Sequence, residues 1–102
     1  MKVVINVEFG GFSVSEEVFE ELAIPWDKYG FLENETLAID SEDDMAYRAD
    51  PGLIAAIEKL GVKEASGSLA CLKIVEVPDD VDRHIHDYDG YETVNENHRS
   101  WS

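Results

Sequence analysis

The residues best suited to chemistry are a carboxylate and two histidines near the C-terminus: Asp82, His84 and His86. If residues 83–88 form a strand, the alternation of side chains places all three on one face. A His-x-His pair beside a carboxylate suits zinc or another divalent ion. His98 would be a further ligand if the fold brought it close. The alternative interpretation is a solvated or hydrogen-bonded histidine pair that binds no metal.

Other catalytic patterns do not emerge from the sequence. With 23 acidic residues in the chain, spacing alone nominates no general acid and base pair. The sequence contains no nucleophile elbow, triad signature or zinc-protease pattern. We therefore nominate no catalytic residue and no cofactor. A small metal-dependent or small-molecule-binding enzyme that uses His84, His86 and nearby carboxylates is the second functional hypothesis.

Aromatic and acidic residues gather in the same region. Tyr88 and Tyr91 flank Asp89, Glu92 follows directly, and Trp101 lies further along the chain. Aromatic side chains supply much of the binding energy at protein interfaces, and carboxylates around them suit a basic partner. The sequence thus predicts an interaction surface made of these five residues. The alternative is that the rings cover the edge of a sheet and complete a small core.

A β-hairpin must position these side chains, and the Asp89-Gly90 pair predicts one. Aromatic and β-branched residues on both sides of the pair indicate strands over residues 83–88 and 91–94. Gly90 readily takes the positive φ that a type I′ turn requires. We expect this hairpin to form the edge of a sheet or a projecting ribbon.

Two helices are predicted from residues that begin and end helices. Ser13 and Glu16 have the spacing of a capping box, and the helix that they begin should end before Pro25. The second helix should follow Asp50 as N-cap, with Pro51 at its first position and Gly61 just beyond its end.

Hydrophobic patterning predicts the remaining strands, at residues 2–9, 36–39, 46–48 and 69–77. The second and third are expected to pair with each other. The last has apolar residues on both faces, which favours a central strand covered by a helix on one side. The prediction is therefore a single α+β domain over residues 1–102. It comprises a mixed or antiparallel sheet of about four or five strands, two helices on one face and a C-terminal β-hairpin.

Charge limits the class of partner. The 102 residues include 8 basic and 23 acidic side chains, for a formal net charge of -15. Such a charge repels phosphates and anionic lipids, so it disfavours direct binding to nucleic acids or membranes and suits a basic protein. A protein that inhibits by mimicking DNA is an alternative. The single cysteine, Cys71, lies in an apolar run and is expected to be a buried, inert thiol.

Two parts of the chain resemble a family of small, mostly uncharacterised proteins encoded by tailed bacteriophages and prophages. The first is the opening, Val3 to Asn6 followed by Phe9 to Ser13. The second is the closing block, which comprises Lys73 to Val81, Tyr88-Asp89-Gly90, Glu92 and His98 to Trp101; Arg48, Asp50-Pro51 and Leu53 add to the likeness. This resemblance implies an accessory protein in the cytoplasm of an infected bacterium. It brings no catalytic residues.

Together these observations predict a function in protein binding. We expect a phage-encoded, acidic, non-enzymatic accessory protein that binds a host or defence protein as an inhibitor or adaptor. The absence of an opening basic and apolar segment, and of any apolar run of membrane-spanning length, agrees with the expected cytoplasmic location. A minor virion or assembly component is a third hypothesis.

Overall fold

Short helices and short antiparallel strands make up the chain. The computed structural model describes residues 1–43, 45–68, 70–78, 84–88, 90–95 and 100–101. The helices are α1 (Glu16–Glu21), α2 (Pro51–Leu60) and α3 (Val62–Ala65), together with the 3-10 helices η1 (Glu35–Leu37) and η2 (Ala46–Ala49). The strands are β1 (Lys2–Asn6), β2 (Leu72–Glu76), β3 (His84–Tyr88), β4 (Tyr91–Asn95) and β5 (Ser100–Trp101).

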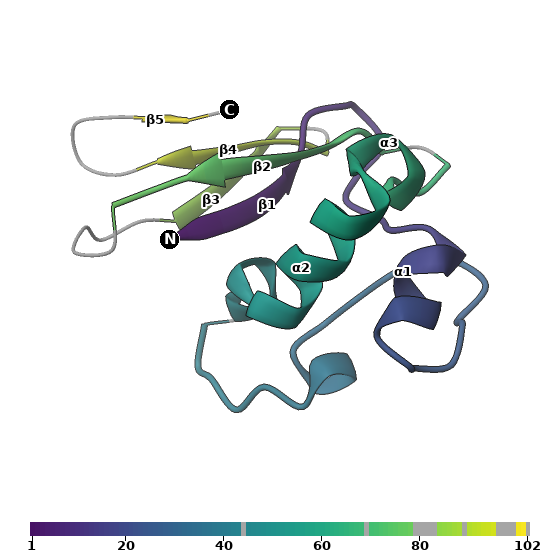
Figure 1. Ribbon diagram of the computed structural model, residues 1–102. Coiled ribbons are helices and arrows are strands. Elements are labelled where there is room, and N and C mark those ends of the chain that lie inside the picture. The colour runs from purple at the N-terminus through teal and green to yellow at the C-terminus, as the bar shows by residue number, and fades with distance from the viewer. Residues whose placement is uncertain (44, 69, 79–83, 89, 96–99, 102) are drawn as a thin grey trace.

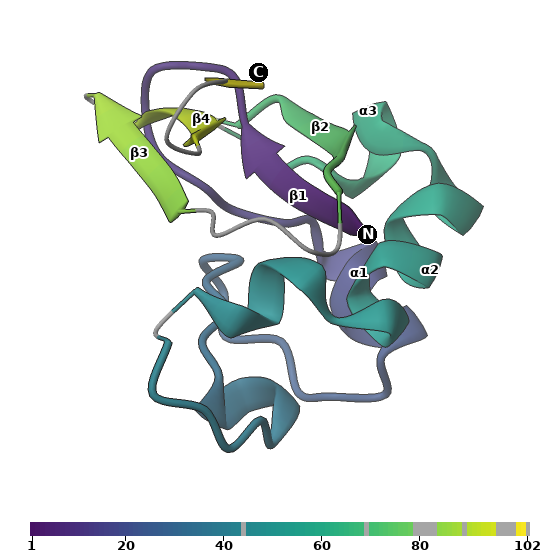
Figure 2. The same cartoon turned by 90° about the vertical axis from the view of Figure 1, so that its left-hand side faces the viewer.

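This arrangement is an α+β fold, as predicted. Figures 1 and 2 show the strands gathered on one side of the molecule and the helices on the other. In the described part of the chain, no helix is long and apolar enough to cross a membrane.

The described strands form two antiparallel sheets, where the sequence had predicted one. β1 pairs with β2, from Lys2 opposite Glu76 to Asn6 opposite Leu72. In the second sheet, β4 lies between β3 and β5. β2 is therefore not a central strand.

A hydrophobic cluster covers each face of the β1–β2 sheet, which explains why β2 is apolar on both faces. Val4 and Leu72 pack into one cluster with residues of α1 and α2. Val3 and Ile5 pack into the other with Val94 of β4. Because side chains alternate along a strand, β1 can bury both sets at once. The helices therefore cover one face and the hairpin the other.

Helix α2 forms as predicted, whereas the predicted capping box of α1 was wrong. The Oδ2 atom of Asp50 accepts a hydrogen bond from the N–H of Leu53 at 2.9 Å. The N-cap of α1 is Ser15, whose side chain makes no capping hydrogen bond. Ser13 is buried, and its carbonyl accepts from the N–H of Gly67 at 3.1 Å. That tertiary contact holds Ser13 in an extended segment ahead of the helix.

The strands predicted at residues 36–39 and 46–48 are also wrong, since η1 and η2 lie there. The side chain of Asn34 links the two segments. Its Nδ2 donates to the carbonyl of Asp43 at 2.8 Å, and its Oδ1 accepts from the N–H of Tyr47 at 3.0 Å. One buried amide side chain thus makes the cross-connections that a backbone ladder would otherwise make.

Candidate functional site

The hairpin predicted at Asp89-Gly90 is present. Strands β3 and β4 pair antiparallel, with Tyr88 opposite Tyr91. Gly90 has a φ of +91°, and its N–H donates to Oδ1 of Asp87 at 2.7 Å. The backbones of the two tyrosines therefore lie side by side, as the sequence predicted. Asp89 lies outside the described residues.

The end of this hairpin is seated on the loop that follows β1. A Cβ atom at Gly90 would lie only 2.2 Å from the backbone nitrogen of Gly11 and 2.7 Å from that of Gly10. Only glycine therefore allows so close an approach. Asn6 supports the contact, since its Nδ2 donates to the carbonyl of Gly90 at 2.7 Å. These contacts hold the hairpin against β1.

An exposed aromatic contact lies at this junction. The ring of Phe9 is 59% exposed, and its centroid lies 5.6 Å from that of Tyr91. Two exposed carboxylates lie on the segments that meet here: Glu8 accepts a hydrogen bond from the N–H of Phe9 at 3.0 Å, and Asp87 accepts one from the N–H of Gly90. We call Glu8, Phe9, Asp87 and Tyr91 the hairpin-end surface. Sequence reasoning missed Phe9 because it placed this residue within the first strand, which ends at Asn6.

Arg48 and Glu92 form a buried, bidentate ion pair between η2 and β4. Nη1 of Arg48 lies 2.6 Å from Oε1 of Glu92, and Nη2 lies 2.8 Å from Oε2. The two residues are only 3% and 1% exposed. The guanidinium also lies over the ring of Phe12, 3.7 Å from its centroid. Parallel hydrogen bonds and ring stacking together fix the orientation of the arginine.

This ion pair also completes the hydrogen bonding of β1 at the edge away from β2. Nη1 of Arg48 donates to the carbonyl of Val4 at 3.4 Å, and the N–H of Asn6 donates to Oε1 of Glu92 at 2.8 Å. A neighbouring strand normally satisfies such backbone groups. Here two side chains take the place of that strand and tie β1, η2 and β4 together.

The electrostatics of the pair keep Arg48 charged. Burial acts to lower the pKa of Arg48, but the hydrogen bonds and the negative charge of Glu92 help to raise this pKa above its ordinary value. Both carboxylate oxygens of Glu92 accept hydrogen bonds within the fold. The pair therefore has a structural role.

The burial of Glu92 corrects the predicted interaction surface. Its carboxylate faces the interior and is engaged by Arg48, so it cannot contact a partner. The alternation of side chains along the strand could have predicted this burial, because Glu92 and Val94 lie two residues apart and share the buried face of β4. The buried role of Arg48 had no comparable local signal, because its partner lies 44 positions away in the sequence.

The predicted metal ligands are only partly described. His84 and His86 both lie on β3, and His86 is exposed. Asp82 and His98 lie outside the described residues. Within the described ranges, no three His, Cys, Asp or Glu side chains form a group that could hold a metal ion. A site at Asp82, His84 and His86 thus stays a prediction.

Two further candidate residues lie at the ends of strands. The backbone of Trp101, in β5, pairs with that of Val94, so this part of the C-terminal segment folds back along β4. Cys71 is exposed, contrary to the buried thiol that we expected. It lies just before β2, where its N–H donates to Oδ1 of Asn6 at 2.9 Å. By the alternation of side chains along a strand, Cys71 lies on the same face as Lys73, which is also exposed.

Comparison of the chain with protein-family models, with curated proteins and with solved structures finds no match.

Proposed function

We propose that this chain is an acidic, non-enzymatic protein that binds a host or defence protein, as an inhibitor or adaptor, through its hairpin-end surface. The exposed ring of Phe9, packed on Tyr91, is the observation that carries the proposal. An aromatic anchor beside carboxylates suits a basic surface patch on the partner. The formal net charge of -15 would add long-range attraction to such a patch.

The contacts that hold the hairpin against β1 support this proposal. Gly90 packs on Gly11, and Glu92 pairs with Arg48, so the turn and β4 are held against the loop that carries Glu8 and Phe9. A binding surface whose backbone is already ordered loses less conformational entropy when the partner binds. Tyr91 keeps its proposed contact role, and the exposed carboxylates of Glu8 and Asp87 replace that of Glu92.

The biological context of the proposal comes from the resemblance to phage and prophage proteins. In that context the partner would be a bacterial protein in the cytoplasm of an infected cell. Tyr88 and Asp89 belong to the same proposed region because they follow Asp87 in the chain, and Trp101 belongs to it because its backbone pairs with Val94 on β4.

A pull-down from bacterial lysate, at low and then high salt, tests the proposal. The bait would be the tagged protein, alongside Phe9→Ser and Tyr91→Ala. Val62→Ala is the matched control, since Val62 is an exposed apolar residue on α3, away from the hairpin. Thermal melts of all variants establish that each is folded.

We expect a bacterial protein that the parent chain and Val62→Ala retain at high salt and that both hairpin variants lose. Equal retention by all variants would contradict a role for the hairpin-end surface. Capture of only basic nucleic-acid-binding proteins, all released by salt, would instead indicate charge mimicry of DNA.

A further inference from the structure

A second surface, which shares no residue with the hairpin-end surface, combines aromatic rings with carboxylates. From residue 29 to residue 35 the side chains alternate between exposed and buried positions. The exposed positions are Tyr29, Phe31, Glu33 and Glu35, and the buried ones are Gly30, Leu32 and Asn34. We call the four exposed residues the 29–35 strip. Along it, two aromatic rings are followed by two carboxylates.

The aromatic half of the strip is unusually exposed. Tyr29 and Phe31 are 70% and 61% exposed, and their rings stack with centroids 6.0 Å apart and an interplanar angle of 13°. Large rings that stack on each other in solvent, instead of packing into the core, are typical of binding sites. Most of the surface of each residue is therefore open to a partner.

The backbone beneath the rings is held in place by hydrogen bonds. Oδ1 of Asp27 accepts from the N–H groups of Tyr29 at 2.9 Å and Gly30 at 2.6 Å, and its Oδ2 accepts from that of Phe31 at 3.1 Å. Gly30 lies against Val14 so closely that a Cβ atom would be 2.1 Å from the carbonyl oxygen of Val14. The rings are therefore presented before any partner binds, which lowers the entropy lost on binding.

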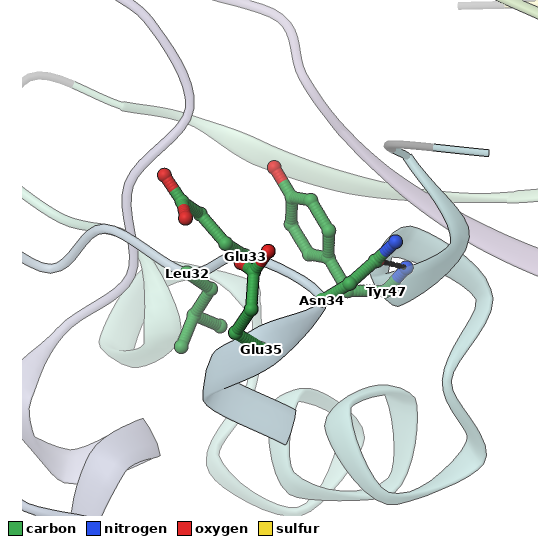
Figure 3. Close-up of a pocket in the computed structure, with 5 residues that line it drawn as sticks. All are labelled: Leu32, Glu33, Asn34, Glu35 and Tyr47. Atoms are coloured by element: carbon green, nitrogen blue, oxygen red, sulfur yellow. Dashed lines mark hydrogen bonds between the residues drawn. The ribbon is translucent and has the colours of Figure 1, made fainter. Parts of the chain in front are cut away.

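The acidic half of the strip lines a pocket. This pocket has a volume of about 420 Å³, and its lining residues are Leu32, Glu33, Asn34, Glu35 and Tyr47 (Figure 3). Asn34 anchors the pocket wall through its hydrogen bonds to Asp43 and Tyr47. Among the described residues, neither Glu33 nor Glu35 has an ion-pair partner. The strip therefore presents two uncompensated negative charges beside two rings.

We propose that the 29–35 strip binds an arginine in an extended, basic segment of a partner protein. A guanidinium is the side-chain group that both stacks on aromatic faces and donates paired hydrogen bonds to carboxylates. A lysine side chain carries the same charge but lacks the planar group that stacks on rings and donates paired hydrogen bonds. The net charge of -15 favours the approach of such a segment. This surface is separate from the hairpin-end surface and does not rest on the function proposed above.

A titration of the isotope-labelled full chain with a Gly-Arg repeat peptide, followed by NMR, tests the proposal. The matching peptide with citrulline in place of arginine keeps the shape and removes the charge. The variants are Tyr29→Ala/Phe31→Ala and Glu33→Gln/Glu35→Gln. Glu16→Gln/Glu17→Gln is the matched control, because it removes the same charge from exposed positions on α1. Melting curves establish that every variant is folded.

We expect amide shifts concentrated at residues 29–35 and at Tyr47, no comparable shifts with the citrulline peptide, and binding about fivefold weaker in either strip variant than in the control. Equal weakening by the Glu16/Glu17 control would show diffuse charge attraction and overturn the proposal. So would shifts confined to the hairpin, or binding of the citrulline peptide. If the amide shifts of the strip changed with protein concentration in the absence of peptide, and sedimentation showed dimers, the strip would be a contact between two copies of this chain, which would also overturn the proposal.

Discussion

At the scale of single residues, the Arg48–Glu92 pair is the contact whose loss should destabilise the fold most. Glu92→Gln removes the charge that compensates a buried guanidinium, so we expect the free energy of unfolding to fall by about 3–5 kcal/mol. Urea denaturation measures this change. Glu42→Gln is the control, because Glu42 is exposed and should change stability by less than about 0.5 kcal/mol. Similar small losses in both variants would show that the pair is not structural.

Replacing both Arg48 and Glu92 separates the effect of their mutual ion pair from the effect of their hydrogen bonds to β1. Buried ion pairs can often be exchanged for apolar residues without loss of stability. In Arg48→Met/Glu92→Leu, however, the carbonyl of Val4 and the N–H of Asn6 lose their partners. We therefore expect this variant to remain about 2 kcal/mol or more less stable than the parent chain, since each orphaned group costs about 1–3 kcal/mol. Full recovery in urea denaturation would contradict the role of the pair as a substitute strand.

Gly90 offers a second prediction at this scale. Gly90→Ala should destabilise the fold more than Gly61→Ala, although both glycines have positive φ. At Gly61 a Cβ atom meets nothing within 4 Å, so only backbone strain of about 1–3 kcal/mol applies. At Gly90 it also meets the backbone of Gly11. Chemical denaturation of the two variants compares them, and equal losses would mean that the hairpin end is not seated on this loop.

At the scale of the element, the loop around Asp27 should respond to acid. Burial acts to raise the pKa of Asp27, but the backbone N–H groups of Gly30, Tyr29 and Phe31 outweigh burial and lower the pKa below its ordinary value of 3.8. Because the pKa of Asp27 is lower in the folded state, its ionised carboxylate stabilises the loop when the pH is above the ordinary pKa of an aspartate. This stabilisation is lost as pH falls through the folded-state pKa.

The amide shifts of Tyr29, Gly30 and Phe31 follow this transition as pH falls from neutral. We expect them to move together, with a midpoint below 3.8. In Asp27→Asn the transition should disappear, because the amide keeps an acceptor oxygen but does not titrate in this range. A midpoint above the ordinary value would contradict the capping role of Asp27.

At the scale of the whole molecule, the charge of -15 should oppose the folded state. Like charges repel in a compact chain, and salt screens exposed charges over a Debye length of about 10 Å at 0.1 M. We therefore expect Tm to rise as sodium chloride is added. Calorimetry measures the rise, which should be smaller in Glu16→Gln/Glu17→Gln because two of the repelling charges are gone. A Tm that falls with salt would show that attractive surface pairs dominate.

Local sequence cues predicted the elements whose geometry is local. The Asp89-Gly90 pair lies at the observed hairpin, and Asp50 caps α2. Each cue acts through φ angles and hydrogen bonds within a few residues, so no distant part of the chain has to be known. The consecutive apolar residues Val3, Val4 and Ile5 of β1 likewise allow burial on both faces of its sheet.

The tertiary structure alone decided the features that join distant segments. The side chain of Asn34, and no strand pairing, links the segments of η1 and η2, and Arg48 engages Glu92 in the interior, where the sequence had predicted a contact residue. The close approach of Gly30 to Val14 fixes the place of the 29–35 strip on the fold. Composition and periodicity describe a residue's neighbours along the chain, whereas these contacts depend on which backbones the completed fold brings together.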